Sequence, residues 1–129
     1  MHILLVNLLS FALFAQSVGP APGRVVTVDL PKTLGTGEMV WIELKVGIIE
    51  RGAEIEIMTT AGRSLGVISP FGIRSGDQAG TYTVPLPADA ISNDRVKLRL
   101  ILNQYGHAKR APTAKEVKGI RLKITRAVL

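Results

Sequence analysis

The sequence contains no cysteine and only 5% aromatic residues. Without cysteine, no disulfide can brace the fold, and both thiolate metal sites and cysteine nucleophiles are excluded. With so few aromatic rings, the core has to be built from Val, Ile and Leu, which favour strands wherever they alternate with polar residues. The composition therefore predicts a small β-domain that is held together by its core alone.

Motifs for catalysis and nucleotide binding are also missing. The sequence has no Gly-x-Ser-x-Gly elbow and no Gly-rich phosphate loop between a strand and a helix. Beyond residue 17 the one histidine is His107. It lies in a polar loop, where a histidine is more often simply exposed to solvent than catalytic. Glu54 and Glu56 share a strand face at a spacing of roughly 6.5 to 7 Å, which a glycosidase could use, but such pairs usually face solvent. We therefore predict no enzyme activity, no cofactor and no metal site, with a small hydrolase as the remaining enzymatic alternative.

The charge of the chain is strongly of one sign. The formal net charge is +6, and the pI is about 10.1. A basic balance of this size suits contact with anionic polymers or anionic surfaces, and it equally serves solubility. Charge alone therefore indicates a class of partner and leaves the fold open.

The first residues have the pattern of an export signal. Ile3–Ala15 is a mostly apolar run, and Ala15-Gln16-Ser17 fits the small-x-small cleavage pattern. Residues 1–17 are predicted to be a signal peptide, 18–23 a Pro/Gly linker and 24–129 a single domain. The mature chain would then be secreted or periplasmic, with no transmembrane span. Because no Lys or Arg precedes the apolar run, a retained anchor or a buried first helix is the alternative.

The stretch Met39–Thr60 is predicted to organise the domain. Apolar residues alternate with polar ones on both sides of Glu50-Arg51-Gly52, which is typical of an antiparallel hairpin. Its inward residues are even-numbered before the turn and odd-numbered after it, so the hairpin needs an even loop or a bulge, for which Gly47 is the natural site. Pairing Lys45 with Glu56 would satisfy this parity.

Other short strands follow the same alternation. We expect them at Arg24–Leu30, Leu65–Ser69, Thr81–Leu86, Arg95–Leu102 and Ile120–Ile124. Prolines 85 and 87 make Thr81–Leu86 an edge or terminating strand, and the connection that follows it has room for one helical turn. The predicted fold is an all-β antiparallel β-sandwich, jelly-roll-like or immunoglobulin-like. With its short closing strand Gly119–Ile124, the pattern resembles the jelly-roll binding modules of secreted proteins, a likeness of architecture that carries over no functional residue.

The candidate binding residues are basic or aromatic. Two strands and the connection between them supply a candidate polyanion-binding set: Lys97, Arg99, Lys109, Arg110, Arg121 and Lys123. If these strands were neighbours, like charges would face each other, unless the acidic strand of Glu54 and Glu56 lies beside them. Trp41 and Tyr105 are candidate residues for stacking against a ligand ring. A tryptophan at such a position is, however, more often half-covered by a neighbouring loop than free to stack.

The sequence thus predicts an exported, non-catalytic β-sandwich. The leading hypothesis is a binding module of the cell envelope for carbohydrate or an anionic polymer. The alternative is a structural or accessory subunit of a secretion or surface assembly. Expected partners are an anionic polysaccharide or an envelope protein, and nucleic acid is not expected.

Overall fold

The structure, a computed structural model, describes residues 21–71 and 76–126. The predicted signal peptide, residues 1–17, and the first part of the predicted linker lie outside the described residues. Among the residues it describes, no helix is long and apolar enough to cross a membrane.

The described chain consists of seven strands and one short 3₁₀ turn. In chain order these are β1 (Arg24–Asp29), β2 (Glu38–Ile48), β3 (Glu54–Thr59), β4 (Ser64–Ile68), β5 (Gln78–Leu86), η1 (Ala88–Ala90), β6 (Arg95–Asn103) and β7 (Val117–Arg126). Each predicted strand is present, and the helical turn expected after Thr81–Leu86 is η1.

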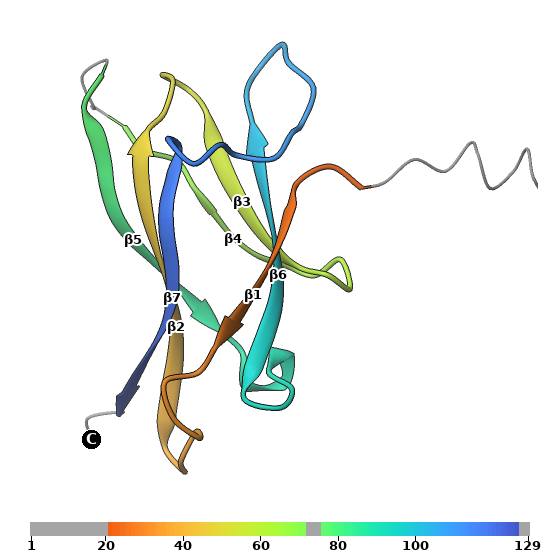
Figure 1. Cartoon of the computed structure of the whole chain (residues 1–129), viewed down its shortest axis with the longest axis vertical. Coiled ribbons are helices and arrows are strands. Elements are labelled where there is room, and N and C mark those ends of the chain that lie inside the picture. Colours follow the sequence, from red (N-terminus) through yellow and green to blue (C-terminus); the bar gives the residue numbers. More distant parts are fainter. Residues whose placement is uncertain (1–20, 72–75, 127–129) are drawn as a thin grey trace, which may run out of the picture.

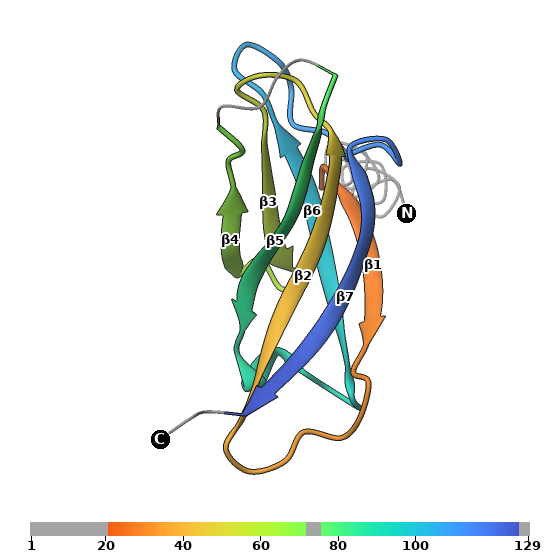
Figure 2. The same cartoon turned by 90° about the vertical axis from the view of Figure 1, so that its left-hand side faces the viewer.

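The strands form two antiparallel sheets that pack into a sandwich, as predicted (Figures 1 and 2). One sheet has the order β1-β6-β3-β4 and the other has the order β5-β2-β7. Among the described strands, β3 and β4 are the only consecutive pair joined within one sheet, because every other connection crosses to the opposite sheet. β5, the strand that carries Pro85, is an edge strand as predicted, where a missing backbone donor does no harm.

The predicted hairpin between β2 and β3 is wrong. Both segments are strands, but β2 lies in one sheet and β3 in the other. Lys45 is paired with Thr81 and Gly119, and Glu56 with Val67 and Ile101, so the two do not pair with each other. The parity mismatch has a simple cause: strands that face each other across a core need not share a register.

The core lies between the two sheets and is aliphatic. Leu44 of β2 faces it from one sheet, and Ile57 of β3 and Leu98 of β6 face it from the other, each with no exposed surface. The alternation of the sequence therefore predicted correctly which side of each of these strands is buried. Burial of such side chains contributes about 1.5 to 3 kcal/mol each.

A bulge interrupts the pairing of β2 with β7 next to Gly47. Lys45 pairs with Gly119 and Val46 with Val117, so Lys118 is the extra residue and lies in β7. Gly47 donates its N–H to the Glu116 carbonyl at 2.8 Å. The prediction of a hairpin bulge at Gly47 is therefore wrong, because the extra residue is Lys118 of β7 and the bulge belongs to the β2–β7 pair.

Candidate functional site

The described residues include an open cleft of about 510 Å³ at one end of the four-stranded sheet. It is lined by the end of β3, the β3–β4 turn, η1 and the start of β6. The lining residues are Thr59, Thr60, Ala61, Arg63, Asp89, Ala90, Ser92, Asn93, Arg95 and Lys97. We call this the basic cleft, because three of its side chains are cationic and one is a carboxylate.

One side of the basic cleft is the tight turn between β3 and β4. The Thr59 N–H donates to the Arg63 carbonyl at 2.8 Å, and the Gly62 N–H donates to the Thr59 carbonyl at 3.0 Å. Gly62 has φ +95°, a left-handed conformation that suits glycine. The Thr59 hydroxyl also accepts the Arg63 N–H at 3.1 Å. These bonds fix the backbone that presents Arg63.

A two-residue turn forms the other side. Asn93 and Asp94 have φ of 55° and 57°, and Ser92 and Arg95 exchange both backbone hydrogen bonds at 2.9 and 3.2 Å. Consecutive left-handed residues between such a pair define a type I′ turn, and Asn and Asp are among the residues that tolerate it. The Asp94 carbonyl also accepts the Leu30 N–H at 2.8 Å. The turn places Arg95 at the beginning of β6.

The cations of the basic cleft differ in their partners. Arg63 binds Asp89 at 3.0 Å, and Arg95 lies 3.4 Å from Asp29 of β1. Both pairs are solvent-exposed, so each contributes at most about 1 kcal/mol and can exchange for a ligand anion. Lys97 makes no ion pair with any described residue, so its charge is open to a ligand.

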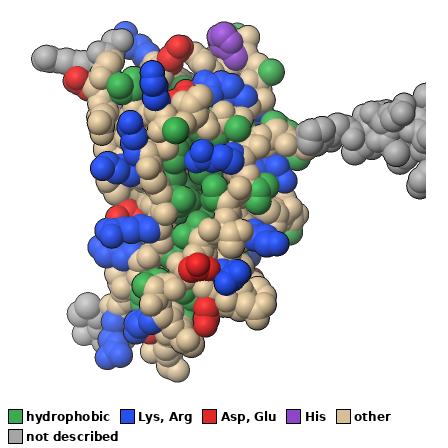
Figure 3. All heavy atoms as spheres, in the orientation of Figure 1, with side chains coloured by type: hydrophobic (Ala, Val, Ile, Leu, Met, Phe, Trp, Pro, Cys, Tyr) green, Lys and Arg blue, Asp and Glu red, His purple; other side chains and the backbone are tan. Residues whose placement is uncertain are grey.

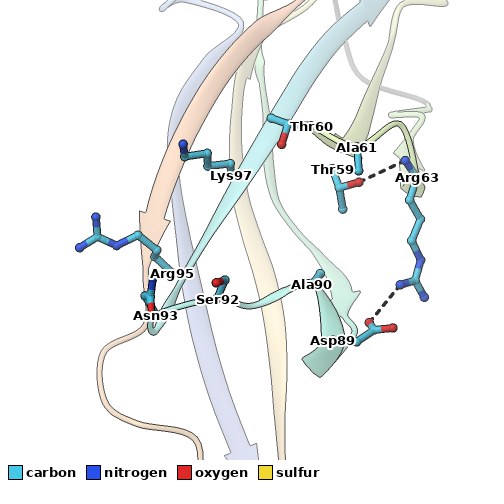
Figure 4. Close-up of a pocket in the computed structure, with 10 residues that line it drawn as sticks. All are labelled: Thr59, Thr60, Ala61, Arg63, Asp89, Ala90, Ser92, Asn93, Arg95 and Lys97. Carbon is cyan, nitrogen blue, oxygen red and sulfur yellow. Dashed lines mark hydrogen bonds and ion pairs between the residues drawn. The ribbon is translucent and has the colours of Figure 1, made fainter.

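Figure 4 shows how these side chains are arranged. Arg63 folds onto Asp89 at one margin, and Arg95 and Lys97 project from the β6 margin. Thr60 and Ser92 lie between the two margins and add hydroxyl groups. Asp89 is the sole carboxylate among the lining residues, which otherwise offer positive charge and hydrogen-bond donors. Such a lining can hold an anion that also carries hydroxyl groups.

The predicted basic residues are divided among β6, β7 and the connection between these two strands. Lys97 and Arg99 lie on β6, whereas Arg121 and Lys123 lie on β7 in the other sheet. The two strands are therefore not neighbours, and the set does not form a single patch. Figure 3 views the side where β7 and β1 form the sheet edges, and blue Lys and Arg side chains flank hydrophobic ones there. The acidic strand β3 does lie beside β6, with Glu56 opposite Ile101.

On the outer face of the three-stranded sheet, two of the predicted site residues, Arg121 and Trp41, have side-chain partners. Arg121 binds Glu43 across the strand pair at 2.7 Å. Lys123 is opposite Trp41, whose half-buried indole donates its N–H to the Thr125 hydroxyl at 2.8 Å. Part of the Trp41 ring is thus covered, and its one polar atom is satisfied.

The remaining predicted residues lie between β6 and β7. Lys109 and Tyr105 are exposed. Arg110 makes two hydrogen bonds, at 2.8 and 2.9 Å, to the buried Glu116 carboxylate, which also accepts the Thr113 N–H. The guanidinium holds the pKa of Glu116 below its ordinary value, and the carboxylate raises the pKa of Arg110. Arg110 is therefore engaged in holding this connection together.

Sequence reasoning missed most of the basic cleft. Arg63 comes from the β3–β4 turn, Asp89 from η1 and Arg95 from the start of β6, and only the topology brings them together. The one local signal was Asn93-Asp94 directly before a strand, which is typical of a type I′ turn. Comparison with protein-family models, curated proteins and solved structures finds no match for this chain. The fold and the basic cleft define a β-sandwich with a cationic surface site.

Proposed function

We propose that this β-sandwich is a non-catalytic binding module for an anionic polysaccharide of the cell envelope, with the basic cleft as its binding site. The observation that carries the proposal is the lining of the cleft, which holds three cations and several hydroxyl groups and only one carboxylate, already paired with Arg63. The apolar run Ile3–Ala15 followed by Ala15-Gln16-Ser17 supports export.

The chemistry of an acidic sugar fits this lining. An arginine guanidinium can make two parallel hydrogen bonds to a carboxylate or a sulfate, and lysine adds a mobile positive charge. Thr60, Ser92 and Asn93 can bind the sugar hydroxyls. The cleft is open rather than enclosed, so a polymer chain can cross it without having to end there.

The test is a binding titration with an oligomer of a uronic acid. Replacing Arg95 and Lys97 together with alanine removes two of the three cleft cations. Because one charge-assisted hydrogen bond contributes about 1.5 to 3 kcal/mol, the Kd should rise at least about tenfold. Affinity should also fall as salt is added, since exposed charges act over only about 8 Å at physiological ionic strength.

The matched control is the replacement of Arg121 and Lys123 with alanine. Like the test variant, it removes one arginine and one lysine, but from the outer face of the other sheet. The proposal expects this variant to keep most of its affinity. An equal loss in both variants would show that net charge alone matters, and a loss confined to the control would place the site on the other sheet. Either result would contradict the proposal.

A further inference from the structure

The end of the sandwich remote from the basic cleft exposes aromatic side chains. Tyr105, in the β6–β7 connection, is 101% exposed, and Phe71, after β4, is 87% exposed. The other aromatic residues in the described part of the chain, Trp41 and Tyr82, are half-buried. Among the residues that the structure describes, the two most exposed aromatic rings thus lie in connections instead of in the core. Large apolar side chains exposed together usually mark an interaction surface.

These connections lie at one end of the molecule. Ile48 at the end of β2 pairs with Gln78 at the start of β5, and Glu54 at the start of β3 pairs with Asn103 at the end of β6. The end of β4 is beside the start of β3, because Ile68 pairs with Ile55. In Figures 1 and 2 the β2–β3 and β6–β7 connections and the end of β4 all lie toward the top. We call this end the loop surface.

The loop surface combines its apolar side chains with positive charge. Ile48, the last residue of β2, is 45% exposed and lies at the same end of the sandwich. The exposed cations on the same connections and at the start of β7 are Arg51, Lys109, Lys115 and Lys118, together with Arg110, whose guanidinium is bonded to Glu116. The exposed acids are Glu50, which accepts a hydrogen bond from Gln104 at 2.6 Å, and Asp77. Apolar and aromatic side chains among basic ones are typical of surfaces that bind the interface of an anionic bilayer.

A lipid surface fits better than a sugar chain. Ile48 and Phe71 have no polar side-chain atom, so they offer a saccharide no hydrogen bond, whereas the acyl region beneath lipid headgroups needs none.

We infer that the loop surface docks onto an anionic lipid bilayer, with Phe71 and Tyr105 entering the headgroup region and the cations contacting lipid phosphates. This interaction is separate from the proposed polysaccharide site. The basic cleft lies at the end of β3 and the start of β6, whereas the loop surface lies at the start of β3 and the end of β6. A docked domain would hold the basic cleft away from the membrane. Polysaccharide could then reach the cleft while the loop surface is occupied.

The absence of cysteine allows a position-specific test on the full chain. A Tyr105→Cys variant can be labelled at that one site with an environment-sensitive fluorophore, and Thr36→Cys provides a control label on an exposed residue of the β1–β2 connection, outside the basic cleft. Vesicles of phosphatidylcholine with phosphatidylglycerol should shift the emission of the label at 105 to shorter wavelength and leave that at 36 unchanged. Vesicles of phosphatidylcholine alone should give a smaller shift. Adding Phe71→Ser to the 105 variant should weaken vesicle binding about tenfold.

Four results would overturn the inference. Equal shifts at 36 and 105 would mean that the apolar run alone carries the protein to the vesicle. No shift at either position, or no effect of Phe71→Ser, would show that the rings do not enter lipid. A shift at 105 caused by a polyuronate without vesicles would assign the loop surface to a saccharide. The polysaccharide titration of the Arg95 and Lys97 variant contains no lipid, so either proposal can fail without the other.

Discussion

Gly47 allows the packing of the sandwich to be tested with one methyl group. Its N–H donates to the Glu116 carbonyl at 2.8 Å, and the next N–H, from Ile48, donates to the Lys115 carbonyl at 2.9 Å. A Cβ on Gly47 would collide with that Lys115 carbonyl oxygen and would lie 3.0 Å from the Lys118 side chain. Because the obstacle is backbone, the segment before β7 would have to move and weaken at least one of these bonds.

The magnitude follows from opposing contributions. Forcing extra volume into a packed site costs about 1 to 3 kcal/mol, and losing one backbone hydrogen bond costs about 0.5 to 1.5 kcal/mol. Replacing glycine with alanine in an extended conformation stabilises a protein by about 0.4 to 1 kcal/mol, because the alanine lowers the conformational entropy of the unfolded chain. Gly47→Ala should therefore lower the free energy of unfolding by about 1 to 4 kcal/mol. At about 4 to 8 °C per kcal/mol, the fall in Tm is easily measured.

Gly119 is the matched control, because it faces Lys45 in the same strand pair. A Cβ there meets nothing within 4 Å, and its φ is not in the left-handed region. Gly119→Ala should leave stability unchanged or raise it by up to about 1 kcal/mol. Urea unfolding can be followed by the fluorescence of the single tryptophan. If Gly47→Ala were as well tolerated as Gly119→Ala, the close approach of the Lys115 segment to β2 would be wrong.

The remaining predictions concern the core and acid stability. Leu44→Ala should cost about 2 to 5 kcal/mol in urea titrations, whereas Glu54→Ala on the outer face should stay within about 0.5 kcal/mol; similar losses would contradict the assigned faces. The Arg110 guanidinium holds the pKa of Glu116 below its ordinary 4.5. The stabilisation by the Glu116 carboxylate is therefore complete above about pH 4.5 and is lost as the pH falls through the lowered value. Glu116→Gln should destabilise the fold at neutral pH and reduce the loss of stability on acidification, and an unchanged pH profile would refute this role.

The sequence allowed the strands and their buried faces to be predicted, but not their partners. Alternation is local, so Leu44 and Ile57 could each be assigned to the core from their neighbours alone. Pairing is non-local, and a short Gly-containing connection fits a hairpin as well as a crossing between sheets. The parity mismatch between the two segments was the local sign that they do not pair.

The candidate site was predictable only in part. Lys97 was named from the sequence because it points outward from a clear strand. Arg63 and Asp89 come from connections far apart in the chain, and their 3.0 Å contact exists only because β3, β4 and η1 meet at one end of the sheet. The six predicted basic residues were grouped by their nearness in sequence, whereas the alternation of strands between sheets places Arg99 and Arg121 on different sheets.

The most direct test of the central claim, that the basic cleft binds an anionic polysaccharide, is a map of the binding site by NMR. Amide shifts of ¹⁵N-labelled protein are followed while a uronic acid oligomer is added. The account predicts that the changes concentrate in residues 59–63 and 89–97, which form the cleft, and that β7 and the loop surface change little. Changes centred on Trp41 and Lys123, or spread evenly over all basic residues, would contradict it.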